Sequence, residues 1–241
     1  MHVRAVRRSS TGYRGCFADL DFADREFCVA WSFSSRDSVA SAAKTDDASA
    51  MGSPPRAVAA VAGRRIDAPG TPESRFPASA EPSVKIAVTH FLSSHGVIAV
   101  VASAACGADI IALEAAGELG IRTRIVLPFA RERFRRTSVE DRGLDWADRF
   151  EAVVERAHAC SDVVVLDDAL GPDDEAYLRA TTRILLEALE LSRAFDARAI
   201  ALAIWDEKPR RAPDSDATRD FLAAAERSRM TTFSIPTTSA A

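Results

Sequence analysis

From Arg56 to the C-terminus, short apolar runs alternate with stretches in which apolar residues recur every three or four positions. A short apolar run is typical of a strand buried on both faces of a parallel sheet, and the longer spacing is typical of an amphipathic helix. The runs predict strands at 57–62, 97–102, 122–127, 162–166 and 199–204, and an edge strand at 231–235. The spacing predicts helices at 81–94, 105–119, 144–159, 173–195 and 216–227.

This regular alternation predicts the fold class. Strands joined through helices by right-handed crossovers form a mainly parallel sheet that is covered by helices on both faces. We therefore expect an α/β, Rossmann-like, doubly wound domain of three layers, with five or six strands, over residues 56–241. Residues 1–55 mix Ser, Asp, Arg and Ala without such a pattern, and we expect a largely irregular N-terminal extension there.

Composition narrows the class of protein. A net charge of −4 gives no basic surface for general binding to nucleic acid phosphates, so we expect no sequence-specific nucleic-acid partner. No run approaches the roughly 18 apolar residues of a membrane span, and the basic start leads into no apolar signal region. We expect a cytoplasmic protein with no membrane partner, and the sequence leaves a homo-oligomer open.

Cysteine and histidine positions bear on metals and redox chemistry. The four cysteines lie too far apart for a paired zinc motif, and the four histidines show no metal-ligand spacing. We expect reduced thiols, no metal and no cofactor. Cys106 lies near a predicted helix N-terminus, which lowers a thiol pKa, yet no histidine is near it in sequence to act as its base.

The candidate chemistry lies where the predicted strands end. In an open doubly wound sheet, ligands bind outside the carboxyl ends of the strands, beside the point where strand order reverses. A strand-to-helix turn there presents free N–H groups and the positive end of the helix to a phosphate, and arginine can bind phosphate through two hydrogen bonds. The loop after the first strand carries Gly63, Arg64, Arg65 and Asp67, and the turn after the second carries Ser103, Ala105, Gly107 and Asp109.

Each of these features also has a structural interpretation. The turn from Ser103 to Asp109 would serve equally as an ordinary strand-to-helix connection with Ser103 as its cap. The arginines between Arg131 and Arg136 fit a solvated charged cluster better than a ligand site. After the fourth strand, Asp167, Asp168 and Gly171 would bind a ribose hydroxyl, supply a general base, or cap the next helix.

Several segments resemble the SLOG superfamily of Rossmann-like nucleotide-sensing domains, which includes the DNA-processing protein DprA and the cytokinin-activating LOG enzymes. The resemblance covers residues 56–206 and points to an uncharacterised bacterial branch. The segments that carry it are 63–70 (GRRIDAPG), 75–77 (RFP), 103–109 (SAACGAD), 114–116 (EAA), 126–129 (VLPF), 137–139 (TSV), 146 with 149–150 (W, RF) and 203–206 (AIWD).

The resemblance implies that the turn at 103–109 faces a phosphate, and hence a nucleotide or nucleotide derivative as the small-molecule partner. We expect a binding sensor in bacterial signalling or stress response, and favour binding over catalysis. LOG-type hydrolases carry Pro-Gly-Gly-X-Gly-Thr-X-X-Glu after the fourth strand, of which this chain keeps only Gly171 and Glu175 in comparable places. The alternatives are a LOG-like phosphoribohydrolase, with Glu175, Asp167 or Asp168 as the acid, and a structural scaffold that assembles partners.

Overall fold

The computed structural model describes residues 54–166, 173–209 and 216–238. All of them belong to one unit of the chain, Asp47–Ala241. The predicted irregular extension at 1–55 therefore lies outside the described residues, except for its last two positions. Within the described ranges, no helix combines the length and the apolar character that crossing a membrane requires.

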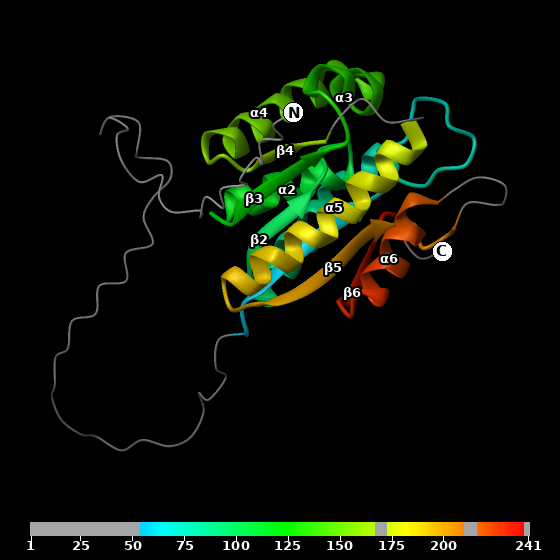
Figure 1. The fold of residues 1–241 in the computed structure, drawn as a ribbon. Coiled ribbons are helices and arrows are strands. Elements are labelled where there is room, and N and C mark those ends of the chain that lie inside the picture. The colour runs from blue at the N-terminus through cyan, green and yellow to red at the C-terminus, as the bar shows by residue number, and fades with distance from the viewer. Residues whose placement is uncertain (1–53, 167–172, 210–215, 239–241) are drawn as a thin grey trace, which may run out of the picture. The chain divides into compact units, whose positions relative to one another are not determined.

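Six parallel strands form one sheet in the order β4-β3-β2-β1-β5-β6 (Figure 1). The chain builds outward from β1 to one edge through β2, β3 and β4, and then returns to the other side of β1 with β5. Strand order thus reverses at β1, which confirms the predicted doubly wound α/β class. The strands are β1 (Ala57–Gly63), β2 (Val97–Ala102), β3 (Arg122–Leu127), β4 (Val163–Val165), β5 (Arg198–Trp205) and β6 (Thr231–Pro236).

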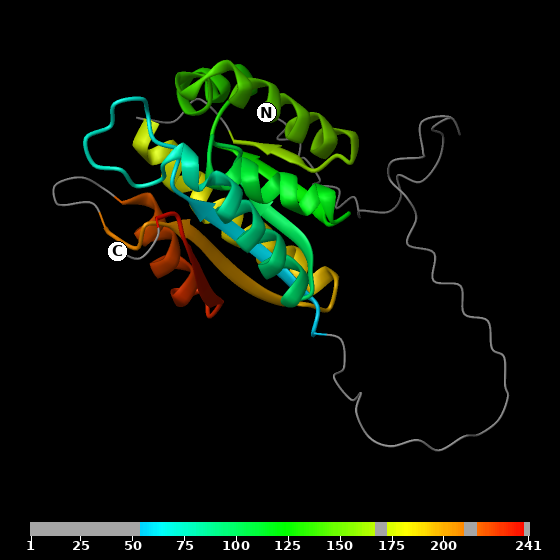
Figure 2. The same cartoon turned by 180° about the vertical axis from the view of Figure 1, so that it is seen from behind.

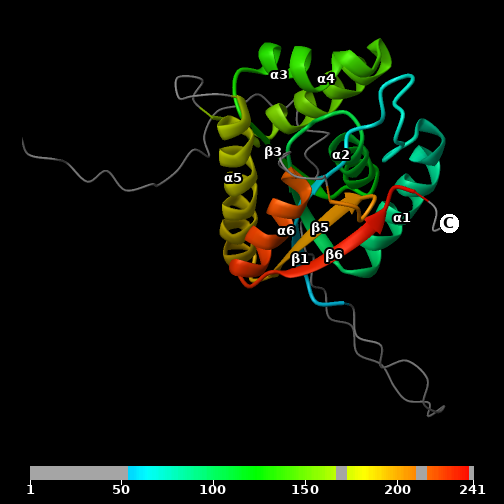
Figure 3. The ribbon, with the colours of Figure 1, turned by 90° about the vertical axis from the view of Figure 1, so that its right-hand side faces the viewer.

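Helices cover both faces of the sheet. Three of them, α1, α2 and α4, pack on one face, and α5 and α6 pack on the other, as the views from behind and from the side show (Figures 2 and 3). This division follows from right-handed crossovers, because connections that run in opposite directions along the sheet place their helices on opposite faces. The helices are α1 (Glu81–Ser94), α2 (Ala108–Glu118), α3 (Arg131–Ser138), α4 (Leu144–Ala159), α5 (Asp173–Ala194) and α6 (Ala217–Arg227), with short 3-10 turns η1 (Ala78–Ala80) and η2 (Glu140–Arg142).

The central strand β1 contributes small side chains to the hydrophobic cores on both faces of the sheet. Ala57, Ala59 and Val61 pack toward α1 and α2, whereas Val58 and Ala60 pack toward α5 and α6. Burial on both faces explains why the strand has a continuous apolar sequence instead of an alternating one. Its small side chains let α2 and α5 approach the middle of the sheet from either side.

The last residue of β1 is a glycine for a steric reason. A Cβ atom on Gly63 would lie 2.2 Å from the carbonyl oxygen of Ile204 and 2.5 Å from the Cβ of Ala108. The absence of a side chain therefore lets β5 and the first residue of α2 close against the end of β1. This close approach places the loop after β1 next to the turn before α2, where the sequence predicted a ligand site.

Candidate functional site

A cleft of about 990 Å³ opens at the carboxyl ends of the central strands. It is bounded by the loops after β1 and β2, by α3 and η2, and by the first turns of α5 and α6. A volume of this size is ample for a nucleotide-sized molecule. Of the residues predicted from sequence to form the site, Gly63, Arg64, Arg65, Asp67, Ser103, Ala105, Asp109 and Glu175 line it.

The other predicted site residues do not line the cleft or cannot be placed. Gly107 does not line the cleft but lies in the turn before α2, next to the backbone of Arg64, Arg65 and Ile66. Asp167, Asp168 and Gly171 lie outside the described residues. The predicted ligand-binding role of all these residues stays a prediction.

The turn before α2 is joined to the loop after β1 by backbone hydrogen bonds. The N–H of Ile66 donates to the carbonyl of Cys106 (3.2 Å), and the N–H of Ala108 donates to the carbonyl of Arg64 (3.1 Å). Gly107 has φ +106°, and a Cβ there would lie 2.5 Å from the nitrogen of Ile66. Only glycine fits this conformation and this spacing, so Gly107 holds the two predicted ligand loops against each other.

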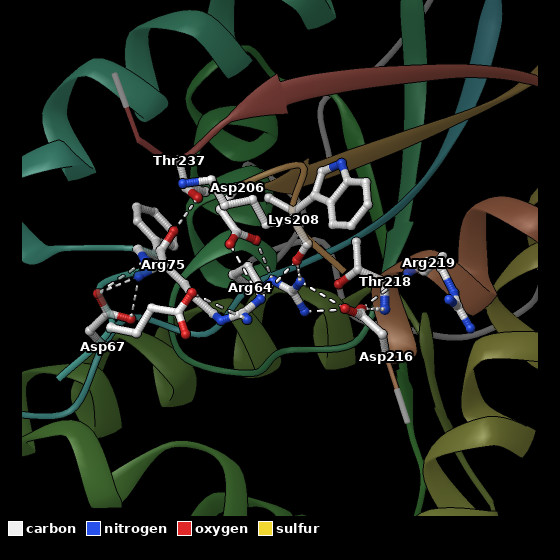
Figure 4. Close-up of polar contacts among 12 residues, drawn as sticks. Arg64, Asp67, Arg75, Asp206, Lys208, Asp216, Thr218, Arg219 and Thr237 are labelled. Atoms are coloured by element: carbon white, nitrogen blue, oxygen red, sulfur yellow. Dashed lines mark hydrogen bonds and ion pairs between the residues drawn. The ribbon is translucent and has the colours of Figure 1, made fainter. Parts of the chain in front are cut away.

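Arg64 lies buried beneath the cleft, with its guanidinium held by carboxylates (Figure 4). Its Nε donates to Asp206 (2.8 Å), and Nη1 and Nη2 donate to the two oxygens of Asp216 (3.0 and 2.9 Å). Nη2 also donates to the carbonyl of Lys208 (2.8 Å). The bidentate geometry that the sequence assigned to a phosphate is thus used within the protein, for Asp216.

Arg75 extends the same network toward the cleft. Its Nη1 donates to Asp206 (3.3 Å) and to the carbonyl of Lys208 (2.8 Å). The backbone N–H of Arg75 donates to the carboxylate of Asp67 (3.0 Å), which also accepts from Ser74 Oγ (2.7 Å). Asp67 therefore closes the loop that it begins, and Arg75 connects this loop to the residues that follow β5.

Arg65 points to the opposite side of its loop and meets a different set of groups. Its Nε donates to the Sγ of Cys106 (3.3 Å), and its Nη2 forms an ion pair with Asp141. Arg142 binds the other oxygen of Asp141 through Nη1 (2.6 Å) and donates from Nε to the carbonyl of Ile66 (2.9 Å). Two guanidinium groups therefore share a single carboxylate at the wall of the cleft.

The Cys106 thiol is an unpromising nucleophile in this arrangement. It is fully buried, and burial raises its pKa even though Arg65 opposes the shift. A thiol with a raised pKa holds little of the reactive thiolate at neutral pH. Burial therefore acts against the activation that a position near a helix N-terminus allows.

Asp109 is a carboxyl group buried at the start of α2. Its Oδ2 accepts a hydrogen bond from the backbone N–H of Ala105 (3.2 Å). Burial raises the pKa of Asp109 to about 7, against the opposing effects of that hydrogen bond and of Arg65. Asp109 thus changes its charge near neutral pH, and it does so inside the cleft wall.

The wall formed by α5 and α3 was not predicted from sequence. Tyr177 Oη and Ser138 Oγ lie 2.7 Å apart, and Leu178 is 58% exposed toward the opening. This wall combines hydroxyl groups with apolar surface, as a ligand with a heterocyclic ring would require. Glu175 stands at its edge, with its side chain 65% exposed and paired with Arg179 (3.7 Å).

The arginine-rich helix α3 lies beside a separate hollow of about 530 Å³. Here Arg131 and Arg135 pair with Glu151, and Arg135 also pairs with Glu140 (2.6 Å). The guanidinium of Arg133 lies over the ring of Phe129, 4.3 Å from its centre. Balanced pairing of this kind agrees with the solvated cluster expected from the sequence.

Within residues 54–166, 173–209 and 216–238, no three His, Cys, Asp or Glu side chains come together as a metal site would require. Among the described residues that line the cleft, the polar side chains are guanidinium, carboxyl and hydroxyl groups.

Comparison with solved structures finds a distant likeness. No protein-family model matches the chain, and no curated protein matches it. The X-ray structure of DNA processing protein A (DprA) from Streptococcus pneumoniae is similar to it at 15% sequence identity, with a TM-score of 0.34. The match covers 75% of this chain, which spans 58% of that chain's length. The likeness concerns the fold alone.

Proposed function

We propose that this chain binds a nucleotide or nucleotide derivative in the strand-end cleft. The observation that carries the proposal is the pair of guanidinium groups, Arg65 and Arg142, that share the one carboxylate of Asp141 at the cleft wall. The two guanidinium groups carry one more charge than the shared carboxylate neutralises. Guanidinium groups also bind phosphate in a planar geometry with two hydrogen bonds. The anionic part of the ligand lies on these two side chains.

The remaining walls support a ligand that is part anion and part ring. Tyr177, Leu178 and Ile184 of α5 offer hydroxyl and apolar surface to the same cleft. When the phosphate of a nucleotide binds the arginines, the base of the same nucleotide can contact this wall. These features account for the binding of a ligand but identify no group that reacts with it. A regulatory role agrees with them for that reason. We therefore propose a sensor of nucleotides in bacterial signalling or stress response.

A ligand panel tests the proposal directly. Isothermal titration calorimetry with AMP, cyclic AMP, ADP-ribose and a short oligonucleotide should show saturable binding of at least one of them. A ligand at 100 times its Kd should also stabilise the fold by about 2.7 kcal/mol in thermal unfolding. If none of the panel binds or raises the melting temperature, the scaffold alternative replaces the sensor.

Two variants test where in the cleft the ligand binds. Arg65→Gln should weaken binding at least about tenfold, because a charge-assisted contact contributes about 1.5–3 kcal/mol. Arg131→Gln is the matched control, since its side chain is also 32% exposed and paired with a carboxylate, but lies outside the cleft. Equal effects of the two substitutions would contradict an anion site at Arg65.

Hydrolysis of an N-glycosidic bond is the second candidate function. It is favoured by Glu175, a carboxylate that lines the same cleft as the proposed anion site. The reaction would add water to a nucleoside monophosphate and release the free base and ribose 5-phosphate. Incubation of the protein with AMP and chromatography for adenine test it, with Glu175→Gln as the control for a contaminating hydrolase. If no adenine is released, binding remains as the proposed function.

A further inference from the structure

The anion end of the cleft holds two guanidinium groups and two carboxyl groups. Arg65 and Arg142 supply the positive charges, and Asp141 supplies a carboxylate that both of them contact. The second carboxyl is Asp109, which accepts from the N–H of Ala105, the residue next to the Cys106 that Arg65 contacts. If both carboxyl groups are ionised, the four side chains have no net charge. If Asp109 holds a proton, they have a net positive charge.

Asp109 is placed so that its protonation concerns the ligand. Its side chain lines the cleft, and one oxygen is occupied by the N–H of Ala105. The other oxygen has no hydrogen-bond donor among the described residues, and it is not enclosed as a buried unsatisfied atom. That oxygen is therefore open to a group in the cleft. A proton on it would be donated to an anionic oxygen, whereas an ionised carboxylate would repel the same anion.

Three other groups near Asp109 are already paired or stay neutral. Arg64 is neutralised by Asp206 and Asp216. The carboxylate of Asp67 accepts three different donors of its own loop. Burial raises the pKa of Cys106, so that its thiol stays neutral. Among the described residues, the charged and titratable groups that line the cleft or adjoin this end of it are Arg64, Arg65, Asp67, Glu73, Arg75, Cys106, Asp109, Asp141, Arg142, Glu175, Tyr177 and Asp220.

We propose that the anion bound by Arg65 and Arg142 binds together with a proton on Asp109, so that the affinity of the cleft for anions falls as the pH rises. The proposal rests on the proposed binding of an anionic ligand and adds how that binding is regulated. The pKa of Asp109, about 7, places the onset of the fall near neutral pH. An anion close to Asp109 raises that pKa further, because it favours the neutral carboxyl.

Sulfate is the probe for this test. The second ionisation of a phosphate group, with a pKa of about 6, would add its own pH dependence, whereas sulfate keeps its charge from pH 6 to pH 8.5. Calorimetric titration of the full chain at constant ionic strength should give a Kd several-fold higher at pH 8.5 than at pH 6. One linked proton sets a limiting slope of about tenfold per pH unit.

Two conservative variants separate Asp109 from the rest of the site. Asp109→Asn keeps an acceptor for the N–H of Ala105 and mimics the neutral carboxyl, so its Kd should equal the low-pH value of the wild type at both pH values. Asp141→Asn is the matched control at the same arginines. It should bind sulfate more tightly at both pH values and keep the wild-type pH dependence.

Three outcomes would overturn the proposal: a wild-type Kd that does not change with pH, a pH dependence that survives in Asp109→Asn, or no saturable sulfate binding at either pH. The wild-type titration decides the first and third without any variant, so it does not depend on the folding of Asp109→Asn. The same measurements distinguish a failure of this proposal from a failure of the proposed function. Nucleotide binding without sulfate binding would overturn only the proton-linked anion site, and sulfate binding without nucleotide binding would overturn only the nucleotide.

Discussion

Arg64 and Asp216 lie 152 positions apart in the chain and form a bidentate ion pair beneath the cleft. Asp216 is also the N-cap of α6, where its carboxylate accepts from the backbone N–H groups of Thr218 and Arg219 (3.2 Å each). One carboxylate thus fixes the start of a helix on one face of the sheet and the loop that follows the central strand. The pair connects the two halves of the sheet at the point where strand order reverses.

Removal of the Arg64 guanidinium should destabilise the fold strongly. Arg64→Gln leaves the buried carboxylates of Asp206 and Asp216 without their main partner, and breaking a buried pair in this way costs about 3–5 kcal/mol. Urea unfolding should show this loss. Arg75→Gln is the control, because Arg75 also binds Asp206 but is more exposed, and it should cost about 1 kcal/mol. Similar losses for the two variants would contradict the structural role of Arg64.

Substitution of Gly107 should disrupt the site more than a glycine elsewhere. In Gly107→Ala the new Cβ would lie 2.5 Å from the nitrogen of Ile66, in addition to the strain of φ +106°. We expect a loss of about 2–3 kcal/mol or more. Gly120→Ala also has a positive φ, of 67°, but its Cβ would meet no atom within 4 Å, so it should cost only about 1 kcal/mol. Thermal unfolding of both variants measures the difference.

Substitution of Asp162, which directly precedes β4, should also destabilise the fold. Its buried carboxylate binds Arg122 (2.7 Å) and Arg124 (2.7 Å), which both belong to β3. Asp162→Asn should cost about 2–3 kcal/mol, a value reduced from that of a fully buried pair because both arginines reach solvent. The surface pair Lys85–Glu118 has a similar distance of 2.6 Å, yet Glu118→Gln should change stability by less than about 0.5 kcal/mol. A large effect of Glu118→Gln would contradict burial as the cause.

Asp109 should make the stability of the unliganded protein depend on pH. Its pKa of about 7 in the folded state lies above the value near 3.9 of an unfolded chain, so the folded state binds the proton more tightly. The stabilisation is fully present below about pH 4 and is lost as the pH rises through 7.

Compared with the wild type, Asp109→Asn should therefore be more stable at pH 8 by an amount on the order of 2–4 kcal/mol, and the difference should shrink toward pH 5. Denaturant unfolding at the two pH values measures it. A difference that is equal at both pH values would show that Asp109 does not titrate between them.

The hydrophobic pattern predicted most of the fold because burial dictates it. The helix at 81–94 and the strand at 122–127 have the predicted bounds, since apolar periodicity begins and ends sharply there. The helix α3, Arg131–Ser138, was not predicted, because it buries little besides Phe134 and Ser138 and has no apolar stripe. The helix α2 begins three residues later than predicted, because the turn that contains Gly107 occupies 105–107.

The candidate site was predicted in part, and for a different reason. The rule for strand ends identified the loops that carry Arg65 and Asp109, since it depends only on strand order. The ion partners could not be predicted in this way, because Asp206 and Asp216 meet Arg64 only when β5 pairs with β1. Arg142 and Tyr177 were missed as well. They lie in a 3-10 turn and a helix whose approach to the cleft depends on how those elements pack.

The order of the strands has a consequence for the growing polypeptide on a ribosome. The strand β2 can pair with β1 soon after synthesis, but β5, the other neighbour of β1, is complete only at Trp205. Until then the central strand has an open edge, and Arg64 lacks both Asp206 and Asp216. Pairing between segments so distant in the chain is slow, because a long loop must close first. The floor of the cleft is therefore among the last parts of the molecule to form.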